Sequence, residues 1–326
     1  MIADLPTGYA ARGYRGAIDH QAFADICNAD SQANGVDEVL TAEDIKNQYD
    51  HLNNCDPATD VVVVEHSGTA VAYGRTDWWD TDEGRRYLML ARTGAEHRPV
   101  LRSMIEWLEL RIAAIAADHP EGAKEMETWA PIGDGSHPFS EALRSANYRI
   151  VTYGAEMLRP DLRDIPGAPL PDGLEIRPVG PDDRRAIWEA DKEAFRDHWG
   201  FSEPTEDDWQ RFVEEPHQDP SLWKVAFEGD QIVGQVRTFI NEVENAEFDR
   251  LRGWTENIST IRRWRKRGVA RALICESLRQ LRDEQGMTEA ALGVHVENPT
   301  GAFALYEGLG YRVTQMYGTF HKPVGR

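Results

Sequence analysis

The sequence is poor in cysteine and contains no long apolar run. Its 326 residues include only three cysteines, Cys27, Cys55 and Cys275, without a Cys-x-x-Cys pair, so we expect neither a disulfide framework nor a metal site. No uninterrupted apolar stretch approaches the roughly 20 residues that a membrane helix needs. The N-terminus has no basic segment followed by an apolar one. These absences predict a cytoplasmic protein with no membrane partner.

Basic residues are also scarce. Lys and Arg number 36 against 56 Asp and Glu, which gives a formal net charge of −20. Nucleic-acid binding needs clustered positive charge against phosphates, so we expect no nucleic acid among the partners. An acidic surface either attracts cationic small molecules or simply keeps a protein soluble, and composition leaves both readings open.

The length suggests two domains, and a proline-rich segment lies near the middle. Residues 159–173 contain four prolines and two glycines, which favour extended backbone over helix. The predicted division is therefore an N-terminal domain over residues 1–160, a linker over 161–173 and a C-terminal domain over 174–326.

The two halves also repeat each other. The turn and strand at 68–75 match those at 229–237, with Arg75 and Arg237 separated by 162 positions (237 − 75 = 162). The Asn-Tyr-Arg segment around Tyr148 matches the Gly-Tyr-Arg segment around Tyr311 at nearly the same separation (311 − 148 = 163). Matches at a common offset on either side of a linker indicate a tandem duplication.

Patterning in the second half predicts elements in the order β-α-α-β-β-β-α-β-α-β. This order indicates an α/β fold of the α+β type, in which a mixed sheet carries helices on both faces.

The segment 265–274 follows a predicted strand and opens a predicted helix. Small residues at 268, 270 and 272 allow close approach to the backbone, and a helix start presents N–H groups without helical partners. These donors suit a pyrophosphate, and the basic side chains beside them would strengthen the site. A basic helix start that only turns the chain is the alternative.

Together with the segment Asn298–Tyr311, this loop resembles the GNAT superfamily of acyl-CoA-dependent N-acetyltransferases. In that family a (Gln/Arg)-x-x-Gly-x-(Gly/Ala) loop binds the CoA pyrophosphate. An Asn-x-x-(x)-Ala-x-x-Leu-Tyr-x-x-x-Gly-(Phe/Tyr) segment supplies a tyrosine near the CoA sulfur. The resemblance covers residues 174–323, and the two-copy layout is similar to that of the mycothiol synthase type. It implies two tandem GNAT-like domains, each a mixed, mostly antiparallel sheet flanked by helices.

The resemblance further implies acetyl-CoA as co-substrate, no metal, and a small-molecule amine as acceptor, in a monomer or homodimer. A larger acyl group and several kinds of amine stay open. The residues that it assigns to the co-substrate are Ile258, Ser259, Thr260, Ile261, Arg265, Lys266, Arg267, Gly268, Val269, Ala270, Arg271, Asn298 and Tyr306.

Two residues are candidates for catalysis. An alkylamine has a pKa of roughly 10, so only about one molecule in a thousand is the free nucleophile at neutral pH and a proton acceptor is useful. Glu256, on the strand that enters the loop, is the candidate base; the alternative is a solvated carboxylate. Tyr306 would protonate the departing thiolate; the alternative is a packing role on its helix.

Three further residues are candidates for the acceptor pocket: His198, Trp199 and Phe201. Their aromatic density suits a pocket wall, and His198 is a second candidate base or a surface histidine. The segment 295–297 has the His-x-Glu pattern of zinc deaminases but lacks the cysteines that follow it there, so we do not assign it to a site. Asn298 is the expected N-cap of the following helix.

The N-terminal copy departs from the family pattern. Pro99 stands opposite Gly268 and has no N–H to donate, and Leu101 replaces the small Ala270. Glu96 would repel phosphate, and the tyrosine position falls near Leu143. We expect this copy not to bind CoA, but to support the second copy or help enclose its substrate. An alternative for the whole chain is a non-catalytic acyl-CoA- or metabolite-binding regulatory protein with a GNAT fold.

Overall fold

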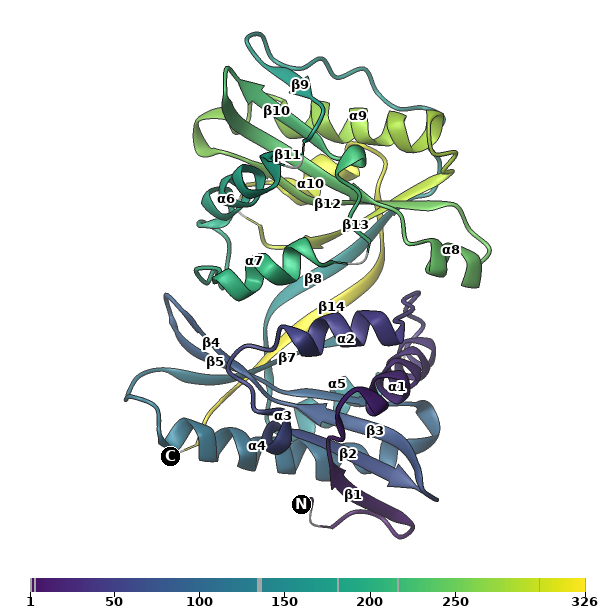
Figure 1. The fold of residues 1–326 in the computed structure, drawn as a ribbon, viewed down its shortest axis with the longest axis vertical. Helices are drawn as coiled ribbons and strands as arrows, with labels where there is room; N and C mark the ends of the chain where they lie inside the picture. The colour runs from purple at the N-terminus through teal and green to yellow at the C-terminus, as the bar shows by residue number, and fades with distance from the viewer. Residues whose placement is uncertain are drawn as a thin grey trace. The chain divides into compact units, whose positions relative to one another are not determined.

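The computed structural model describes residues 2, 4–133, 137–180, 182–215, 217–298 and 300–325. Its contacts divide the chain into two compact units (Figure 1). Unit 1 comprises residues 1–153, 205–216 and 316–326, and unit 2 comprises residues 154–204 and 217–315. These units differ from the predicted division at 160 and 174 in two ways. Residues 154–173, which include the predicted linker, group with unit 2, and two segments of the second half group with unit 1.

Both of these segments have specific partners in unit 1. The end of the C-terminal strand, Met316 to Pro323, pairs antiparallel with strand β7 (Lys124–Ile132). Within it, Phe320 is fully buried in the apolar core of unit 1. The other segment contains helix α7 (Glu206–Val213), and Glu214 just after it contacts His51 at 3.1 Å.

Unit 1 holds a four-stranded antiparallel sheet, further strands and six α-helices among the described residues. The four-stranded sheet has the order β1-β2-β3-β6, and β5 pairs parallel with β7. The strands are β1 (Tyr9–Gly13), β2 (Val61–His66), β3 (Thr69–Arg75), β4 (Trp78–Thr81), β5 (Gly84–Leu88), β6 (Leu90–Thr93) and β7. The helices before α7 are α1 (His20–Ala33), α2 (Ala42–Asp50), α3 (Pro57–Asp60), α4 (Leu101–Ala117) and α5 (Pro138–Ser145).

Unit 2 contains a mixed sheet in which β13 lies between β8 and β12, followed by β11, β10 and β9. Only the β12–β13 pair in this series is parallel. Five strands lie wholly in unit 2: β9 (Glu175–Arg177), β10 (Lys224–Glu228), β11 (Gln231–Phe239), β12 (Arg252–Thr260) and β13 (Glu289–His295). Two further strands are divided between the units: β8 (Arg149–Arg159) belongs to unit 2 from residue 154 on, and β14 (Arg312–Pro323) belongs to it up to residue 315. The helices are α6 (Asp183–Phe195), α8 (Glu242–Glu247), α9 (Val269–Asp283) and α10 (Ala302–Glu307).

Helices α6 and α9 cover opposite faces of this sheet. On β11, Arg237 bonds Asp191 of α6, whereas the preceding residue, Val236, lies in the apolar cluster that contains Leu273 of α9. Successive strand residues point to opposite faces, so the two helices must lie on either side. The predicted mixed sheet with helices on both faces is confirmed.

The first sign of the repeat in the structure is a shared irregularity. The β2–β3 hairpin has a register shift between Val64 and Glu65, and the β10–β11 hairpin has one between Ala226 and Phe227. The two shifts are separated by the offset seen in the sequence (226 − 64 = 162). An extra residue at the same place in both hairpins is a feature of the fold and not a local accident.

Helix starts repeat as well. Thr41 and Asp44 form a reciprocal capping box at α2, with N–H to side-chain oxygen distances of 2.7 and 3.2 Å. Thr205 and Asp208 form the same box at α7, at 2.8 and 3.2 Å.

The turns that follow α5 and α10 also match. The N–H of Tyr148 donates to the carbonyl of Leu143 at 2.9 Å, and the N–H of Tyr311 donates to the carbonyl of Tyr306 at 3.1 Å. The predicted tandem repeat is therefore present in backbone geometry as well as in sequence. Separately, no helix within the described ranges is long and apolar enough to cross a membrane.

Candidate functional site

Strands β12 and β13 separate along their length. Their parallel pairing ends at Trp254 and Ala291, while β12 continues to pair with β11 as far as Thr260. Asn257 lies in an irregularity of the β11–β12 register and has φ of +47°, a conformation that L side chains rarely adopt. The bulge turns β12 away from β13 at the carboxyl ends of both strands.

A cavity of about 870 Å³ opens at this separation, within unit 2. Its volume lies in the range of small-molecule sites, and its walls are mainly apolar. The predicted site residues that line it are His198, Glu256, Ile258, Ser259, Thr260, Arg265, Lys266, Gly268, Val269, Ala270, Arg271, Asn298 and Tyr306. Residues 100 positions apart in the chain are thus brought to one place.

One end of the cavity is formed by the start of α9. Gly268 precedes the helix with φ of +90°, and a Cβ there would meet no atom within 4 Å, so the position faces open space. Lys266 also has a positive φ, of +61°. The first amide to find a helical acceptor is that of Ala272, which donates to Gly268 at 2.9 Å. The amides before it in the first turn have no carbonyl within α9, and they carry the positive end of the helix dipole.

Glu256 extends from β12 to the next strand. Its Oε1 accepts the N–H of Gly293 on β13 at 2.6 Å, so a side chain replaces the backbone pairing that has ended two residues earlier. Desolvation by the surrounding protein raises the pKa of Glu256 to about 7, against the opposing effect of the Gly293 amide. The carboxyl group therefore titrates near neutral pH while facing the cavity.

Tyr306 lies on α10 and is 5% exposed. Desolvation raises its pKa, and the nearby charge of Glu256 and the phenol of Tyr311 act in the same direction. The phenol thus keeps its proton over the physiological range and can act as a hydrogen-bond donor toward the cavity.

Arg265 has a different place from the one that the loop pattern suggested. Its guanidinium donates to Asp197 at 2.8 Å, to the carbonyl of Ala194 at 2.8 Å and to the carbonyl of Thr260 at 3.1 Å. Arg262 binds the same carboxylate, and these two guanidinium groups hold the pKa of Asp197 well below its usual range. Arg265 therefore fastens the end of α6 to the loop.

Four predicted site residues do not line the cavity. Arg267 is exposed and lies over the ring of Trp264, 5.0 Å from its centroid. Ile261 packs against the apolar core of unit 2, and its N–H donates to Val233 at 3.0 Å. Phe201 and Trp199 also lie outside the lining.

Trp199 nevertheless contacts a residue that does line the cavity. Its ring stacks on His295, with centroids 5.8 Å apart and planes 8° from parallel. His295 also lies 5.4 Å from His198, and desolvation lowers its pKa, with His198 adding to the effect. Sequence analysis considered His295 only as part of a His-x-Glu pattern and did not assign it to a site. Its position at the end of β13 was a usable signal, since the ends of parallel strands meet at one edge.

Asn298 caps a turn and not the helix. Its Oδ1 accepts the N–H of Thr300 at 2.9 Å and the hydroxyl of Thr300 at 2.6 Å. Helix α10 begins later, at Ala302, after Gly301 with φ of +80°. The expected N-cap role is therefore wrong, because the left-handed Gly301 separates Asn298 from the helix. Pro299 lies outside the described residues.

Across the described part of the chain, no group of three His, Cys, Asp or Glu side chains is placed to hold a metal ion.

Comparison with known proteins agrees with this geometry. Residues 184–311 match the Acetyltransferase (GNAT) family. A mycothiol acetyltransferase from Salinispora tropica is 31% identical over 189 residues, 57% of this chain and 59% of the relative. The matched segment thus spans about three fifths of that curated relative.

Solved structures extend the match to the whole chain. A GCN5-related N-acetyltransferase from Sphaerobacter thermophilus superposes with a TM-score of 0.73 at 25% identity, covering 99% of this chain and 98% of that one. A tandem GNAT protein from the clavulanic acid biosynthesis pathway has a TM-score of 0.66 at 12% identity, with 98% of each chain covered. Residues 184–311 are therefore similar to the GNAT acetyltransferase family, and the chain has the fold of tandem GNAT proteins.

Proposed function

We propose that unit 2 binds acetyl-CoA and transfers its acetyl group to the primary amine of a small molecule. The observation that carries this proposal is the cavity between β12 and β13, which places Glu256, Tyr306 and the start of α9 around one space. In this proposal α9 binds the pyrophosphate, and the amine and thioester meet near Glu256.

The loop residues fit a CoA pyrophosphate. Gly268, Val269 and Ala270 at the start of α9 line the cavity, and Lys266 and Arg271 line it too. A Cβ at Gly268 would meet no atom within 4 Å. Amides and a helix dipole are well suited to a doubly charged anion. The guanidinium of Arg265 is bound to Asp197, so the backbone and these two cations would hold the phosphates.

Glu256 would accept the proton of the acceptor ammonium, directly or through water. A general base is most effective when its pKa lies near the working pH, and the pKa of about 7 meets this condition. Tyr306 would donate a hydrogen bond to the sulfur as negative charge develops there. Because its pKa is raised, stabilisation of the thiolate by this bond is favoured over complete proton transfer.

Direct attack of the amine on the thioester is the proposed route. All three cysteines lie in the described part of the chain, and none of them lines the cavity. Cys275, the cysteine of unit 2, is buried within α9, and desolvation raises the pKa of its thiol. An acyl-enzyme intermediate on cysteine is therefore disfavoured.

The test is a panel of amines incubated with the full chain and acetyl-CoA. CoA release is followed as free thiol, and products are identified by mass. The relatives named mycothiol acetyltransferases make the unacetylated amino-sugar thiol of mycothiol a member of the panel, beside polyamines, aminoglycosides and peptide amines. Acetylation of one class above the hydrolysis background supports the proposal. Tight acetyl-CoA binding without turnover of any amine favours the non-catalytic binding protein instead.

A further inference from the structure

A second carboxylate projects from the strands that hold Glu256. Glu156 of β8 stands opposite Gly293 of β13 in their antiparallel register. Opposed residues in such a pair project to the same face. The Glu256 carboxylate lies on that face too, because a Cβ on Gly293 would be 3.5 Å from its Oε1. The two acids thus approach each other across a glycine, where a larger residue would intervene.

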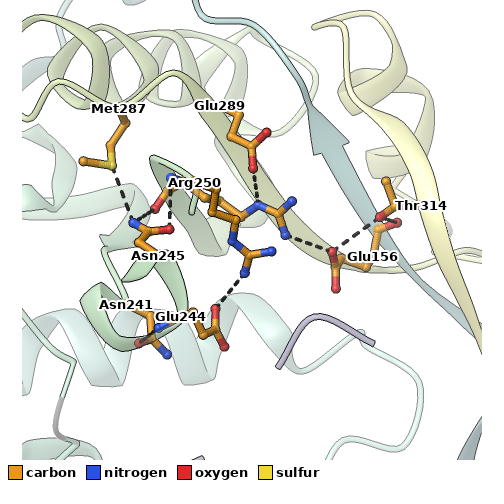
Figure 2. A network of polar contacts seen from close by, with 9 residues as sticks. Glu156, Asn241, Glu244, Asn245, Arg250, Met287, Glu289 and Thr314 are labelled. Atoms are coloured by element: carbon orange, nitrogen blue, oxygen red, sulfur yellow. Dashed lines mark hydrogen bonds and ion pairs between the residues drawn. The ribbon is translucent and has the colours of Figure 1, made fainter. Parts of the chain in front are cut away.

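Glu156 is held in place by its neighbours. Arg252 of β12 lies 3.6 Å from its carboxylate and donates to Glu289 at 2.7 Å. The hydroxyl of Thr314 contacts both the carbonyl and the carboxylate of Glu156, at 3.3 and 3.4 Å, as Figure 2 shows. The side chain of Glu156 is 17% exposed. It therefore forms the end of an anchored polar network, beside the site but outside the lining of the cavity.

The other charged and titratable groups near Glu256 come from different elements. Arg237 of β11 stands opposite Glu256 in register, but it also binds Asp191 of α6 at 2.7 Å, so its positive charge is shared between two acids. Tyr306 and Tyr311 are neutral, because desolvation raises the pKa of each. Among these groups, Glu156 is the negatively charged side chain that is held in place next to β13, since it stands opposite Gly293.

We propose that Glu156 is a positioning residue for the base: its carboxylate, fixed by Arg252 and Thr314, places a second negative charge behind Glu256 and makes Glu256 a stronger proton acceptor. A like charge disfavours the ionised form of its neighbour and so increases the neighbour's affinity for a proton. This inference rests on the proposed role of Glu256, and it assigns Glu156 no contact with substrate.

The first test is the pH profile of kcat/KM in the full chain. Glu156→Gln is expected to move the acid limb of the profile to lower pH, on the order of half to one unit, while the acetyl-CoA dissociation constant stays unchanged. Glu175→Gln, an equal change of charge on the edge strand β9, is the matched control and should leave the limb in place. An unmoved limb overturns the proposal. A raised KM for the amine with an unmoved limb also overturns it, because Glu156 would then contact the acceptor.

The second test needs no turnover. Carboxyl-labelled protein is titrated by carbon NMR, and the Glu256 signal is assigned by its loss in Glu256→Gln. The Glu256 midpoint should fall in Glu156→Gln and fall less in Glu156→Asp, which keeps the charge and serves if the Gln variant does not accumulate. A midpoint that falls in a protein that acetylates no amine keeps this inference and rejects the proposed function. If the midpoint does not move and the protein does acetylate an amine, this inference is rejected and the proposed function is kept.

Discussion

The two units share the hairpin bulge and the turn before the repeated tyrosine, but their equivalent helices α9 and α4 begin differently. In unit 2, α9 starts after Gly268 in a left-handed conformation. In unit 1, α4 continues directly from a 3-10 turn that contains Pro99, and its preceding residue, Val100, is right-handed helical. The scaffold therefore depends on features that both copies keep, whereas an anion site depends on a few amides that one copy lacks.

The interiors of the two units also differ, in that only unit 2 keeps a space for a ligand at the compared position. At the place where unit 2 has Tyr306 facing a cavity, unit 1 has Leu143, which is fully buried among apolar side chains that include Met89 and Met104. One fold can thus fill a given place with side chains or leave it open to a ligand. Occupancy by side chains suits stability, and the open version suits binding.

The largest effect is expected at the helix start. Gly268→Pro should abolish acetyl-CoA binding, because proline holds φ near about −65°, opposite in sign to the observed +90°, and removes an amide. Pro99→Gly in unit 1 should create no second site, since Leu101 and the helical backbone remain. Calorimetry should find one site per wild-type chain. Two equivalent sites would break the comparison between the units.

The base should give the next largest effect. Glu256→Gln is expected to lower kcat/KM at neutral pH by roughly 10²–10⁴-fold, and the loss should shrink as the pH approaches the pKa of the amine. If the loss of kcat/KM does not depend on pH but decreases with added salt, Glu256 is an electrostatic anchor and not the base. The counterpart in unit 1 is Leu90, which pairs with Arg75 as Glu256 pairs with Arg237. The control carboxylate in unit 1 is therefore Glu127, on another strand, buried and bonded to His321 at 2.7 Å. Glu127→Gln should change the melting temperature and leave the shape of the pH profile intact.

Substitutions at position 306 and at the matching position in unit 1 should affect different properties, turnover in the first case and stability in the second. Tyr306→Phe is expected to lower kcat about tenfold with little change in acetyl-CoA affinity, because the hydroxyl matters only as charge develops on sulfur. Leu143→Ala, at the matching place in unit 1, should cost about 2–5 kcal/mol of unfolding free energy and leave the acetyl-CoA dissociation constant unchanged. Unaltered kcat in Tyr306→Phe would make both positions structural.

The smallest expected effect is on stability. Since the pKa of Glu256 is about 7 in the folded chain and lower in the unfolded one, the folded state binds more protons between these values, and stability falls as the pH rises through them. Glu256→Gln should therefore raise the melting temperature relative to wild type at pH 8 and have little effect at pH 5. Glu307→Gln, an exposed change on α10, is the control. Equal differences at both pH values would contradict the raised pKa.

Much of the fold was open to prediction because its signals are local. The hairpin turns, the tyrosine segments and the glycine at the start of α9 are each encoded by a short stretch of sequence. Comparing the two halves at the repeat offset shows whether each of these features recurs in the other half or is absent there. The grouping of α7 and of residues 316–326 with unit 1 was not predictable. It depends on contacts such as those of Glu214 with His51 and of Phe320 with the distant core.

The site shows the same limit. The loop, Glu256 and Tyr306 were singled out from their positions on predicted elements and from the resemblance to the GNAT family. The structure brings them to one cavity, and their roles remain proposals. Arg265 could not be placed, because its ion pair with Asp197 joins residues far apart in the chain. Glu156 gave no signal either, since only the register of β8 with β13 sets it opposite Gly293.

The pairing of β7 with the end of β14 has a consequence for biosynthesis. Strand β7 is complete at residue 132, but its partner segment, residues 316–323, leaves the ribosome almost two hundred residues later. Until then the nascent unit 1 has an open strand edge and lacks Phe320 in its core. Open edges are templates for pairing with other chains. Unit 1 therefore cannot complete its sheet before residues 316–323 have been synthesised, and a fragment cut near residue 160 would lack part of that sheet.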